Sequence, residues 1–463
     1  MDKEFFKDKK VLIMGLGRFG GGVDAALFAD GCGAKVTITD MLPDNKLKES
    51  IEQLQGLGEF EYHLGFHLQE DFNNTDIVIV NPAVNPDNEY LEIARQHKKV
   101  ITSQVEIFFE LCPARIIGIT GANGKSTTAA LTAHLLKAGI DQEGIDYKNV
   151  WLSGNIGNEP MLTLLEHIST DDLVVLELSS FQLEQLAWIE KAPFLALITN
   201  LTPNHLDRHG TFENYCAAKK NIFKYQRLDE ENPAVSVFNA EDEITAEWFE
   251  KYNKQRGRLC IKYSTGDISD EIAGAFMLPG RANRSNLAAA LAVSDYFGVD
   301  INAAKSTLPE FKALAHRLEL VAEINGVKWY NDSISTTPVS SIAALDSFEE
   351  PKILIAGGYD KGLAFDELGK VIAQKAKAAI LIGDTSRKIS DAIKSATEDT
   401  ENSEKLIKVE IVDSLEEAVE LANKIAVAGD VVLLSPACAS YDMFDNFQHR
   451  GREFIKLVHK LEK

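Results

Sequence analysis

The chain has 463 residues, of which 45% are hydrophobic and 25% charged, and its 48 basic and 70 acidic side chains leave a net charge of −22. This is the composition of a globular protein with sizeable cores, and the acidic balance excludes a protein that binds duplex nucleic acid through a large basic surface. The five cysteines form no CxxC pair, no stretch of 18 apolar residues occurs, and the first ten residues lack the apolar run of a signal peptide. We therefore expect a cytoplasmic protein with reduced cysteines and no membrane insertion.

Short apolar, β-branched runs alternate with helical patterns along the chain, which is typical of α/β units with parallel sheets. At roughly 150 residues per domain, the length favours about three domains. We place them at residues 1–111, 112–312 and 313–463. The predicted strands are 11–14, 35–39 and 76–80 in the first, 115–120, 172–178, 194–199 and 234–238 in the second, and 327–331, 352–356, 378–383, 408–412 and 430–435 in the third.

The first predicted strand leads into a glycine-rich loop. VLIMGLGRFGGG places Gly15, Gly17 and Gly20 in a GxGxxG pattern, and Asp40 follows the next strand. This spacing is that of a dinucleotide-binding loop, in which the acidic residue takes a ribose hydroxyl. It invites a nicotinamide dehydrogenase as one hypothesis. Because nothing in the rest of the chain suggests hydride transfer, we interpret the loop as a site for a nucleotide diphosphate.

The strand at 115–120 leads directly into GANGKST and then into a helical pattern. Gly121 and Gly124 allow backbone N–H groups to close on phosphate oxygens, and the following helix N-terminus favours an anion. Lys125 supplies a positive charge for the β- and γ-phosphates, and Ser126 or Thr127 offers a hydroxyl to Mg²⁺. The loop is a shorter form of GxxxxGK[ST]. We predict that ATP is bound by Gly121, Ala122, Asn123, Gly124, Lys125, Ser126 and Thr127.

Further polar residues follow predicted strands of the same domain. Glu177 closes an apolar strand, and a buried carboxylate is costly unless it is paired or binds a metal; a solvated strand cap is the alternative. His205 follows the strand at 194–199. A lone histidine is more often a packing or surface residue, but the phosphate loop and Glu177 favour a ligand role. Lys219 and Lys220 lie in a predicted helix, and the residues alone do not choose between them.

Eight motifs fall in a fixed order along nearly the whole chain. They are TGANGKST, LELSSFQLE, NHLDRHG, YCAAK, AHRLE, NDSISTTP, AGGYDKG and SPACASYDMFDNFQHRG. Together they resemble the motifs of the Mur ligases of peptidoglycan synthesis, and the last of them most resembles the member that adds D-glutamate. The resemblance implies a Rossmann-like N-terminal domain for the UDP-linked substrate, a central P-loop ATPase domain and a Rossmann-like C-terminal domain for the incoming amino acid.

The resemblance also implies the reaction and its small-molecule substrates. ATP phosphorylates the alanyl carboxylate of UDP-N-acetylmuramoyl-L-alanine to an acyl phosphate, and the amine of D-glutamate then displaces phosphate. Lys125 and two Mg²⁺ ions would screen the repulsion between the carboxylate and the phosphoryl group. We expect a monomer with no nucleic-acid partner. The alternatives are a related ligase that adds another amino acid and a nucleotide-binding protein without catalysis.

The same resemblance assigns roles to single residues. Lys125, His205 and Lys219 would be catalytic. Ser126 and Glu177 would hold one Mg²⁺, and His205 would help to hold the other. Lys219, which fits the YxAAK pattern better than Lys220, would carry a carbamate and thereby become an anionic metal ligand.

Binding residues are implied in the same way. Gly15, Gly17 and Asp40 would bind the UDP moiety, and Asn155 the muramoyl end. Asn283, Asn286, Arg317 and Asp332 would contact ATP, and Thr336, Lys361, Ser440 and Phe447 would line the amino-acid pocket.

For three of these residues the sequence leaves a simpler alternative. Asn286 could cap the apolar helix that follows it, and Arg317 could pair with Glu319 or Glu323 at the surface. Lys361 could be an ordinary loop residue.

The chain departs from the family pattern at several positions. Ile334 stands where some members have a lysine near the amino-acid pocket, and Asn204 where an aspartate sometimes precedes the histidine. Around the first glycine loop, the residues that do not match the expected uracil contacts are Arg18, Phe19, Met41 and Leu42.

Overall fold

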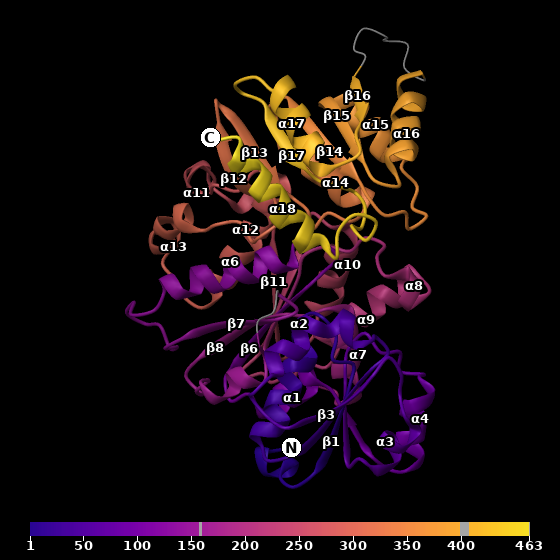
Figure 1. Cartoon of the computed structure of the whole chain (residues 1–463). Coiled ribbons are helices and arrows are strands. Elements are labelled where there is room, and N and C mark those ends of the chain that lie inside the picture. Colours follow the sequence, from indigo (N-terminus) through magenta and orange to yellow (C-terminus); the bar gives the residue numbers. More distant parts are fainter. Residues whose placement is uncertain (157–159, 399–406, 463) are drawn as a thin grey trace. The chain divides into compact units, whose positions relative to one another are not determined.

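The computed structural model describes residues 1–156, 160–398 and 407–462. Its strands form three sheets, each flanked by helices (Figure 1). The chain divides into two compact units, of which the first comprises Met1–Asp267 and Asn286–Thr307 and the second Ile268–Ser285 and Leu308–Lys463. Within the described residues, no helix combines the length and the apolar character needed to cross a membrane.

The first sheet has the strand order β3-β2-β1-β4-β5, and all its strands are parallel. Val11 and Ile13 of β1 pack into one core cluster, whereas Leu12 and Met14 pack into another on the opposite face. Both faces are therefore buried, which explains why the strand reads as a continuous apolar run. The elements are β1 (Lys10–Met14), α1 (Gly21–Gly31), β2 (Lys35–Asp40), α2 (Asp44–Leu54), β3 (Phe60–Leu64), α3 (Gln69–Asn74), β4 (Ile77–Val80), α4 (Glu89–Gln96), β5 (Val100–Thr102) and α5 (Gln104–Leu111).

The second sheet, in the same unit, has the order β11-β10-β9-β6-β8-β7 and is also parallel throughout. Its strand β6 lies between β8 and β9, so the loop that follows β6 emerges at the middle of the sheet. The elements are β6 (Arg115–Thr120), α6 (Lys125–Ala138), β7 (Val150–Gly154), β8 (Leu173–Glu177), α7 (Ser180–Trp188), β9 (Leu195–Ile198), α8 (Leu206–His209), α9 (Phe212–Lys224), β10 (Ala234–Asn239), α10 (Glu243–Tyr252), β11 (Arg258–Tyr263) and α13 (Ile301–Thr307). The next helix in the chain after β11, α11 (Asp270–Ala275), belongs to the second unit, and the residues of α12 (Arg281–Tyr296) are divided between the two units.

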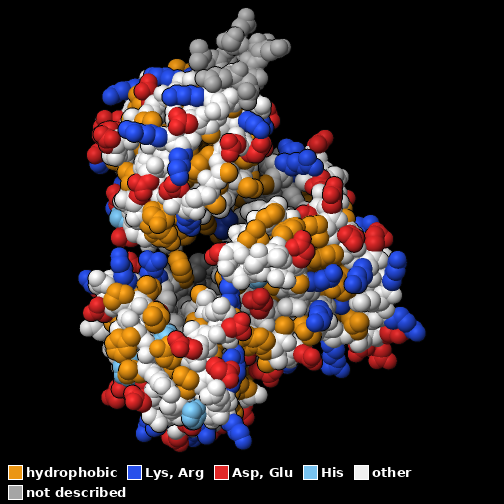
Figure 2. Space-filling model, turned by 90° about the vertical axis from the view of Figure 1, so that its right-hand side faces the viewer, with side chains coloured by type: hydrophobic (Ala, Val, Ile, Leu, Met, Phe, Trp, Pro, Cys, Tyr) orange, Lys and Arg blue, Asp and Glu red, His pale blue; other side chains and the backbone are white. Residues whose placement is uncertain are grey.

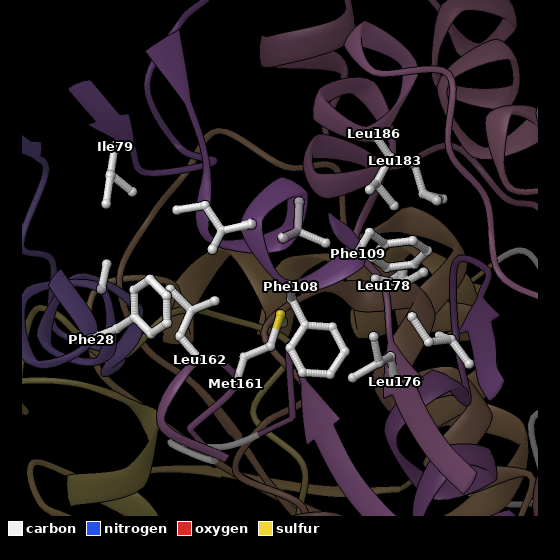
Figure 3. Packing of buried hydrophobic residues seen from close by; sticks show 14 of the residues in the cluster. Phe28, Ile79, Phe108, Phe109, Met161, Leu162, Leu176, Leu178, Leu183 and Leu186 are labelled. Atoms are coloured by element: carbon white, nitrogen blue, oxygen red, sulfur yellow. The ribbon is translucent and has the colours of Figure 1, made fainter. Parts of the chain in front are cut away.

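One hydrophobic core joins these two sheets. Phe108 and Phe109 of α5 pack with Met161, Leu176 and Leu183 in a single buried cluster, and Figure 3 shows these side chains side by side. Burying large aromatic and aliphatic side chains contributes roughly 1.5–3 kcal/mol each. This shared core holds the first glycine loop and the second sheet within one compact unit.

A buried carboxylate adds hydrogen bonds between segments of this core. Asp24 of α1 is only 3% exposed, and its carboxylate accepts the N–H groups of Met161, Leu162 and Thr163 at 2.8, 2.7 and 3.0 Å. The side-chain amide of Gln104 donates a fourth hydrogen bond at 2.5 Å. Asp24 therefore links the helix after the first glycine loop to the segment between β7 and β8.

Replacing Asp24 is expected to destabilise the protein substantially. In Asp24→Asn, the new NH₂ group faces backbone donors, so we expect a loss of about 2–3 kcal/mol in the free energy of unfolding. Urea unfolding measures this loss. The matched control is Asp44→Asn on the exposed start of α2, for which a change within about 0.5 kcal/mol is expected. Equal effects of the two substitutions would contradict the anchoring role.

The third sheet forms the core of the second unit, with the order β12-β13-β17-β14-β15-β16. Strand β12 is antiparallel to β13, and the remaining pairs are parallel. Ile353 and Ile355 of β14 face one core cluster, and Leu354 and Ala356 face the other. The elements are β12 (Glu319–Ile324), β13 (Val327–Asn331), α14 (Pro338–Leu345), β14 (Lys352–Gly357), α15 (Asp366–Lys375), β15 (Ala376–Ile382), α16 (Ser386–Glu398), β16 (Lys408–Ile411), α17 (Leu415–Ile425), β17 (Val431–Leu434) and α18 (Phe447–Lys460).

The predicted α/β class with parallel sheets is confirmed, and each strand predicted from an apolar run is present with ends that shift by at most two residues. Five strands, β3, β5, β7, β11 and β12, were not predicted, and all of them lie at sheet edges. On the face that Figure 2 shows, acidic and basic side chains are interspersed.

Candidate active site

The loop between β6 and α6 has a backbone that requires glycine at two positions. Gly121 has φ 144° and Gly124 has φ 80°, both in the region that L-residues rarely adopt. A Cβ atom would collide with the Thr199 hydroxyl at Gly121 and with the Asn286 amide oxygen at Gly124. The glycines therefore allow the loop to lie close to Thr199 and Asn286, and their role in admitting phosphate oxygens stays a prediction.

Residues after β9 hold this loop in place. Asn200 accepts the N–H of Ala122 with its backbone oxygen at 2.8 Å and the N–H of Asn123 with its side-chain oxygen at 2.9 Å. The Thr199 hydroxyl donates to the Asn123 carbonyl at 2.6 Å. The sequence analysis did not single out Thr199 and Asn200, although a polar TN pair directly after a buried strand is a usable signal.

Helix α6 begins at Lys125, so its first N–H groups face the loop, which is the arrangement that binds phosphate. The Lys125 ammonium donates to the Ala122 carbonyl at 2.9 Å and so lies over the loop. Ser126 and Thr127 are buried beside it. The predicted ATP-binding residues of the loop are thus assembled around one helix N-terminus.

Glu177 lies at the end of β8, next to β6, and is only 2% exposed. Its Oε1 accepts the side-chain amide of Asn155 at 3.0 Å, and its carbonyl accepts the Asn155 N–H at 2.9 Å. Its Oε2 is buried and accepts no hydrogen bond from any residue that the structure describes. The carboxylate is therefore not a solvated strand cap, and it has an acceptor available to a cation.

Lys219 is fully buried on α9 and reaches the strand that carries the phosphate loop. Its Nζ donates to the Thr120 hydroxyl at 3.1 Å and lies 4.9 Å from the centre of the Tyr215 ring. Burial holds the pKa of Lys219 well below its ordinary value, the charge of Lys125 lowers it further, and Glu177 opposes this. Lys220 instead places its Nζ over the ring of Trp248 at 4.8 Å. The structure thus places Lys219, not Lys220, beside the phosphate loop.

His205 precedes α8 and adopts a left-handed backbone with φ 52°. The residue is exposed, and its ring centre lies 5.2 Å from that of Phe181 on α7. Among the described residues, no group of three or more His, Cys, Asp or Glu side chains is arranged to hold a metal.

The side chains around the phosphate loop nevertheless fit Mg²⁺. This ion prefers oxygen ligands and is usually held by one or two protein groups together with substrate phosphates. The buried Oε2 of Glu177 and the hydroxyl of Ser126 are oxygen donors of this kind. Unmodified Lys219 does not fit, because an ammonium group has no lone pair to offer.

The two asparagines predicted for ATP lie in different units. Asn286 belongs to the first unit, and its Oδ1 accepts the Thr128 hydroxyl at 3.2 Å, close to Gly124. The alternative of a helix N-cap is wrong for Asn286, because α12 begins five residues earlier, at Arg281. Asn283 belongs to the second unit and donates to the Pro279 carbonyl at 2.8 Å.

The first glycine loop follows β1 at the carboxyl end of the first sheet. Gly15 and Gly17 have φ values of 94° and 63°. Asp40 is buried and accepts the N–H groups of Gly17 at 2.9 Å and Leu42 at 2.8 Å. The Asn81 amide donates to the Gly15 carbonyl at 3.2 Å. Asp40 therefore shapes the loop itself, and a role toward a ribose hydroxyl stays a prediction.

Four residues that do not match the family pattern surround this loop. Phe19, Met41 and Leu42 are 57%, 61% and 38% exposed, and Arg18 is exposed as well. They leave apolar side chains open beside the loop.

In the second unit, Asp332 follows β13 and is buried. Its carboxylate accepts the hydroxyls of Ser335 and Ser435 at 2.5 and 2.8 Å and the N–H of Leu318 at 3.2 Å. Burial raises the pKa of Asp332 to about 6, although these bonds and the charge of Arg317 oppose the rise. Arg317 is thus close enough to Asp332 to act on its charge.

The four residues predicted for the amino-acid pocket all follow parallel strands, β13, β14 and β17, and so lie beyond the carboxyl ends of these strands. Ser440 is buried, whereas Lys361 is exposed with its Nζ 6.0 Å from the ring centre of Tyr441, the residue after Ser440. Phe447 begins α18, and its carbonyl accepts the Ser333 hydroxyl at 2.8 Å. Thr336 is half-buried just before α14. Lys361 thus lies near Tyr441, which follows Ser440 in the chain.

Arg450 was missed, although it lies in the last motif. It is 1% exposed, and burial lowers the pKa of its guanidinium to about 10. It donates to the hydroxyl and carbonyl of Ser333 at 3.0 and 2.9 Å and to the Cys438 carbonyl at 3.1 Å. Arg450 therefore ties the loop after β13 to the loop after β17, which carries Ser440.

Comparisons with known proteins agree over the whole chain. Residues 119–277 match the family model of the Mur ligase middle domain, and residues 316–438 match that of the Mur ligase, glutamate ligase domain. The UDP-N-acetylmuramoylalanine--D-glutamate ligases of Acetivibrio thermocellus and Clostridium tetani are each 40% identical to the chain, with 99% of this chain and 98% of each relative covered.

Solved structures share the fold. MurF from Acinetobacter baumannii matches 100% of this chain and 92% of its own with a TM-score of 0.56 at 15% identity. A pseudomurein peptide ligase type C from Methanothermus fervidus matches 98% of this chain and 100% of its own with a TM-score of 0.53, also at 15% identity.

Proposed function

The chain belongs to the Mur ligase family, and from this we infer that it is an ATP-dependent ligase that adds D-glutamate to UDP-N-acetylmuramoyl-L-alanine in peptidoglycan synthesis. The observation that carries this function is the 40% identity, over 99% of the chain, to ligases named for that activity. Half-buried Lys125, together with buried Glu177 and Lys219, supplies a chemical basis for the ATP-dependent step at the second sheet.

We propose three domains, at 1–111, 112–312 and 313–463, which bind the UDP moiety, ATP and the amino acid in turn. Each of the three sheets offers loops at its carboxyl end, where ligands of α/β sheets bind. Gly15, Gly17 and Asp40 serve the UDP moiety, and Asn155 serves the muramoyl end. Toward ATP, the residues outside the loop are Asn283, Asn286, Arg317 and Asp332, and those of the amino-acid pocket are Thr336, Lys361, Ser440 and Phe447.

The first chemical step joins two anions. The alanyl carboxylate attacks the γ-phosphorus of ATP, and ADP leaves, so an acyl phosphate forms. The backbone N–H groups at the start of α6 and the ammonium of Lys125 hold the phosphates and offset their charge. In the second step, the amine of D-glutamate attacks the acyl carbon, loses a proton and expels phosphate.

Mg²⁺ supplies further charge neutralisation at the phosphoryl group when it is bound. We propose Ser126 and Glu177 as its ligands, with a second ion held by His205 and a carbamate on Lys219. The depressed pKa of Lys219 supports this, because a neutral amine is the form that reacts with carbon dioxide. For the whole protein, we propose a cytoplasmic monomer.

Release of ADP is expected only when UDP-N-acetylmuramoyl-L-alanine and D-glutamate are both present. A coupled ADP assay with each amino acid in turn tests this, with L-glutamate and D-aspartate as the sharpest comparisons. We expect D-glutamate to exceed both by about 100-fold or more in kcat/KM, because a polar pocket rejects a misplaced carboxylate strongly. Because Ile334 replaces a lysine of the family pattern near this pocket, an equal or better rate with another amino acid would assign the chain to a different ligase of the family.

A further inference from the structure

His209 is a buried histidine that the proposed chemistry does not use. It ends the four-residue helix α8 and is 7% exposed. Its Nε2 lies 2.9 Å from the hydroxyl of Ser180, and its Nδ1 lies 3.4 Å from a carboxylate oxygen of Glu184. Both partners are on α7, so the two nitrogens of one ring fasten α8 to that helix.

The same ring lies between two aromatic residues that support site groups. It stacks on Phe181 with 5.4 Å between ring centres and an interplanar angle of 27°, and it meets Tyr215 edge-on at 5.4 Å. Phe181 also packs against the ring of His205, and Tyr215 lies beneath the Nζ of Lys219. One side chain thus touches the supports of both His205 and Lys219.

The backbone around His209 needs such support. A helix of one turn is not stable by itself, because nucleation costs more than a single turn of hydrogen bonds returns. The His209 N–H donates to the His205 carbonyl at 3.0 Å, and the Asn214 amide of α9 donates to the His209 carbonyl at 2.9 Å. His205 itself has the left-handed φ of 52°. The conformation of this segment is therefore set by its contacts with α7 and α9.

We propose that His209 is a positioning residue for the ATP-dependent step, which sets His205 and Lys219 relative to each other through the polar contacts of its two ring nitrogens with Ser180 and Glu184. The inference rests on the proposed function, since it assigns His209 to the assembly of groups proposed there. It concerns the hydrogen bond to Ser180 and the polar contact with Glu184, and not the bulk of the ring, and this distinction makes it testable.

Two substitutions separate hydrogen bonding from packing. His209→Phe keeps an aromatic ring beside Phe181 and Tyr215 but removes both the hydrogen bond to Ser180 and the polar contact with Glu184, whereas His209→Gln loses the ring and keeps an amide within reach of Ser180. We expect His209→Phe to lower kcat at least 30-fold while the KM for ATP stays within threefold, and His209→Gln to recover part of the rate. The reverse order, with Phe equal to the wild type and Gln inactive, would show that His209 only fills space and would overturn the proposal.

Two further measurements keep this test independent of folding and of turnover. The matched control is Tyr147→Phe, which removes a buried hydroxyl that donates to the Leu136 carbonyl at 2.7 Å, away from α7, α8 and α9. In urea unfolding, the control and His209→Phe should lose comparable amounts of the free energy of unfolding. Only the control should keep the wild-type kcat. In ¹³C-bicarbonate, the NMR signal of a carbamate on Lys219 should fall in His209→Phe and persist in Tyr147→Phe.

The failure of this proposal differs from the failure of the proposed function. If the wild type releases no ADP with D-glutamate, the function is wrong whatever His209 does. If the wild type turns over and His209→Phe matches it in kcat, the function stands and the positioning role is wrong.

Discussion

Lys125→Ala is expected to abolish ADP release while leaving the fold intact. The ammonium lies over the phosphate loop at the Ala122 carbonyl, where it meets the charge that develops when a carboxylate attacks a phosphoryl group. Its loss is expected to lower kcat/KM by a factor of about 1,000 or more, which corresponds to about 4 kcal/mol of barrier. The coupled ADP assay measures this effect.

A lysine on the same helix provides the control. Lys137 lies exposed near the end of α6, and Lys137→Ala is expected to keep the wild-type rate. Urea unfolding of both variants should stay within about 1 kcal/mol of the wild type. If Lys125→Ala kept turnover within about tenfold, or roughly 1.4 kcal/mol, the loop lysine would have no part in the mechanism.

Replacing Lys219 by alanine is expected to remove most of the activity, by a factor of about 100 or more, as is typical when a group that stabilises the transition state is lost. Because Lys219 is buried, the variant leaves a cavity where the proposed carbamate would stand. A short carboxylate such as formate or acetate can enter that cavity and replace the missing anion. Added carboxylate should therefore restore part of the rate, which titration in the ADP assay would measure.

The adjacent lysine is the matched control for this experiment. Lys220 packs on Trp248, away from the phosphate loop, so Lys220→Ala is expected to keep near wild-type turnover and to show no response to formate. Full activity of Lys219→Ala would remove the carbamate from the mechanism. If only Lys220→Ala lost activity, the role would belong to Lys220 and the assignment to Lys219 would be wrong.

The sequence predicted the central strands of each sheet and missed five of the six edge strands that the structure describes, all but β16, for a physical reason. A central parallel strand is buried on both faces and reads as one apolar run, as in LVVLE of β8. An edge strand is partly solvated, so charged or polar residues interrupt the apolar ones in β3, which reads FEYHL, and in β12, which reads ELVAEI. Such stretches differ little from loops until their pairing partner is known.

For the site, local patterns identified the groups that a single segment carries. The positions of strand ends and the spacing of loop residues were enough to predict the glycine loop and the carboxylate of Glu177 at the end of β8. Lys219 and Lys220 could not be distinguished by residue type, because neighbours on a helix point about 100° apart and only packing decides which faces inward. The N-cap alternative for Asn286 arose because the first residues of α12 are mostly polar, so the apolar pattern that predicts the helix begins only after Asn286. Arg450 was missed because a buried arginine is rare.

The way in which the phosphate loop is held has a consequence for synthesis on the ribosome. Its hydrogen-bond partners come much later in the chain, with Asn200 following Asn123 by 77 residues and Asn286 following Thr128 by 158. Strand β6 also pairs with β8 and β9, which are both translated after it. A nascent chain that has just emerged with GANGKST thus lacks the contacts that shape the loop, and such non-local pairing forms slowly. Nucleotide affinity should therefore arise late in translation, after the second half of the first unit has emerged, so that an incomplete chain does not sequester ATP.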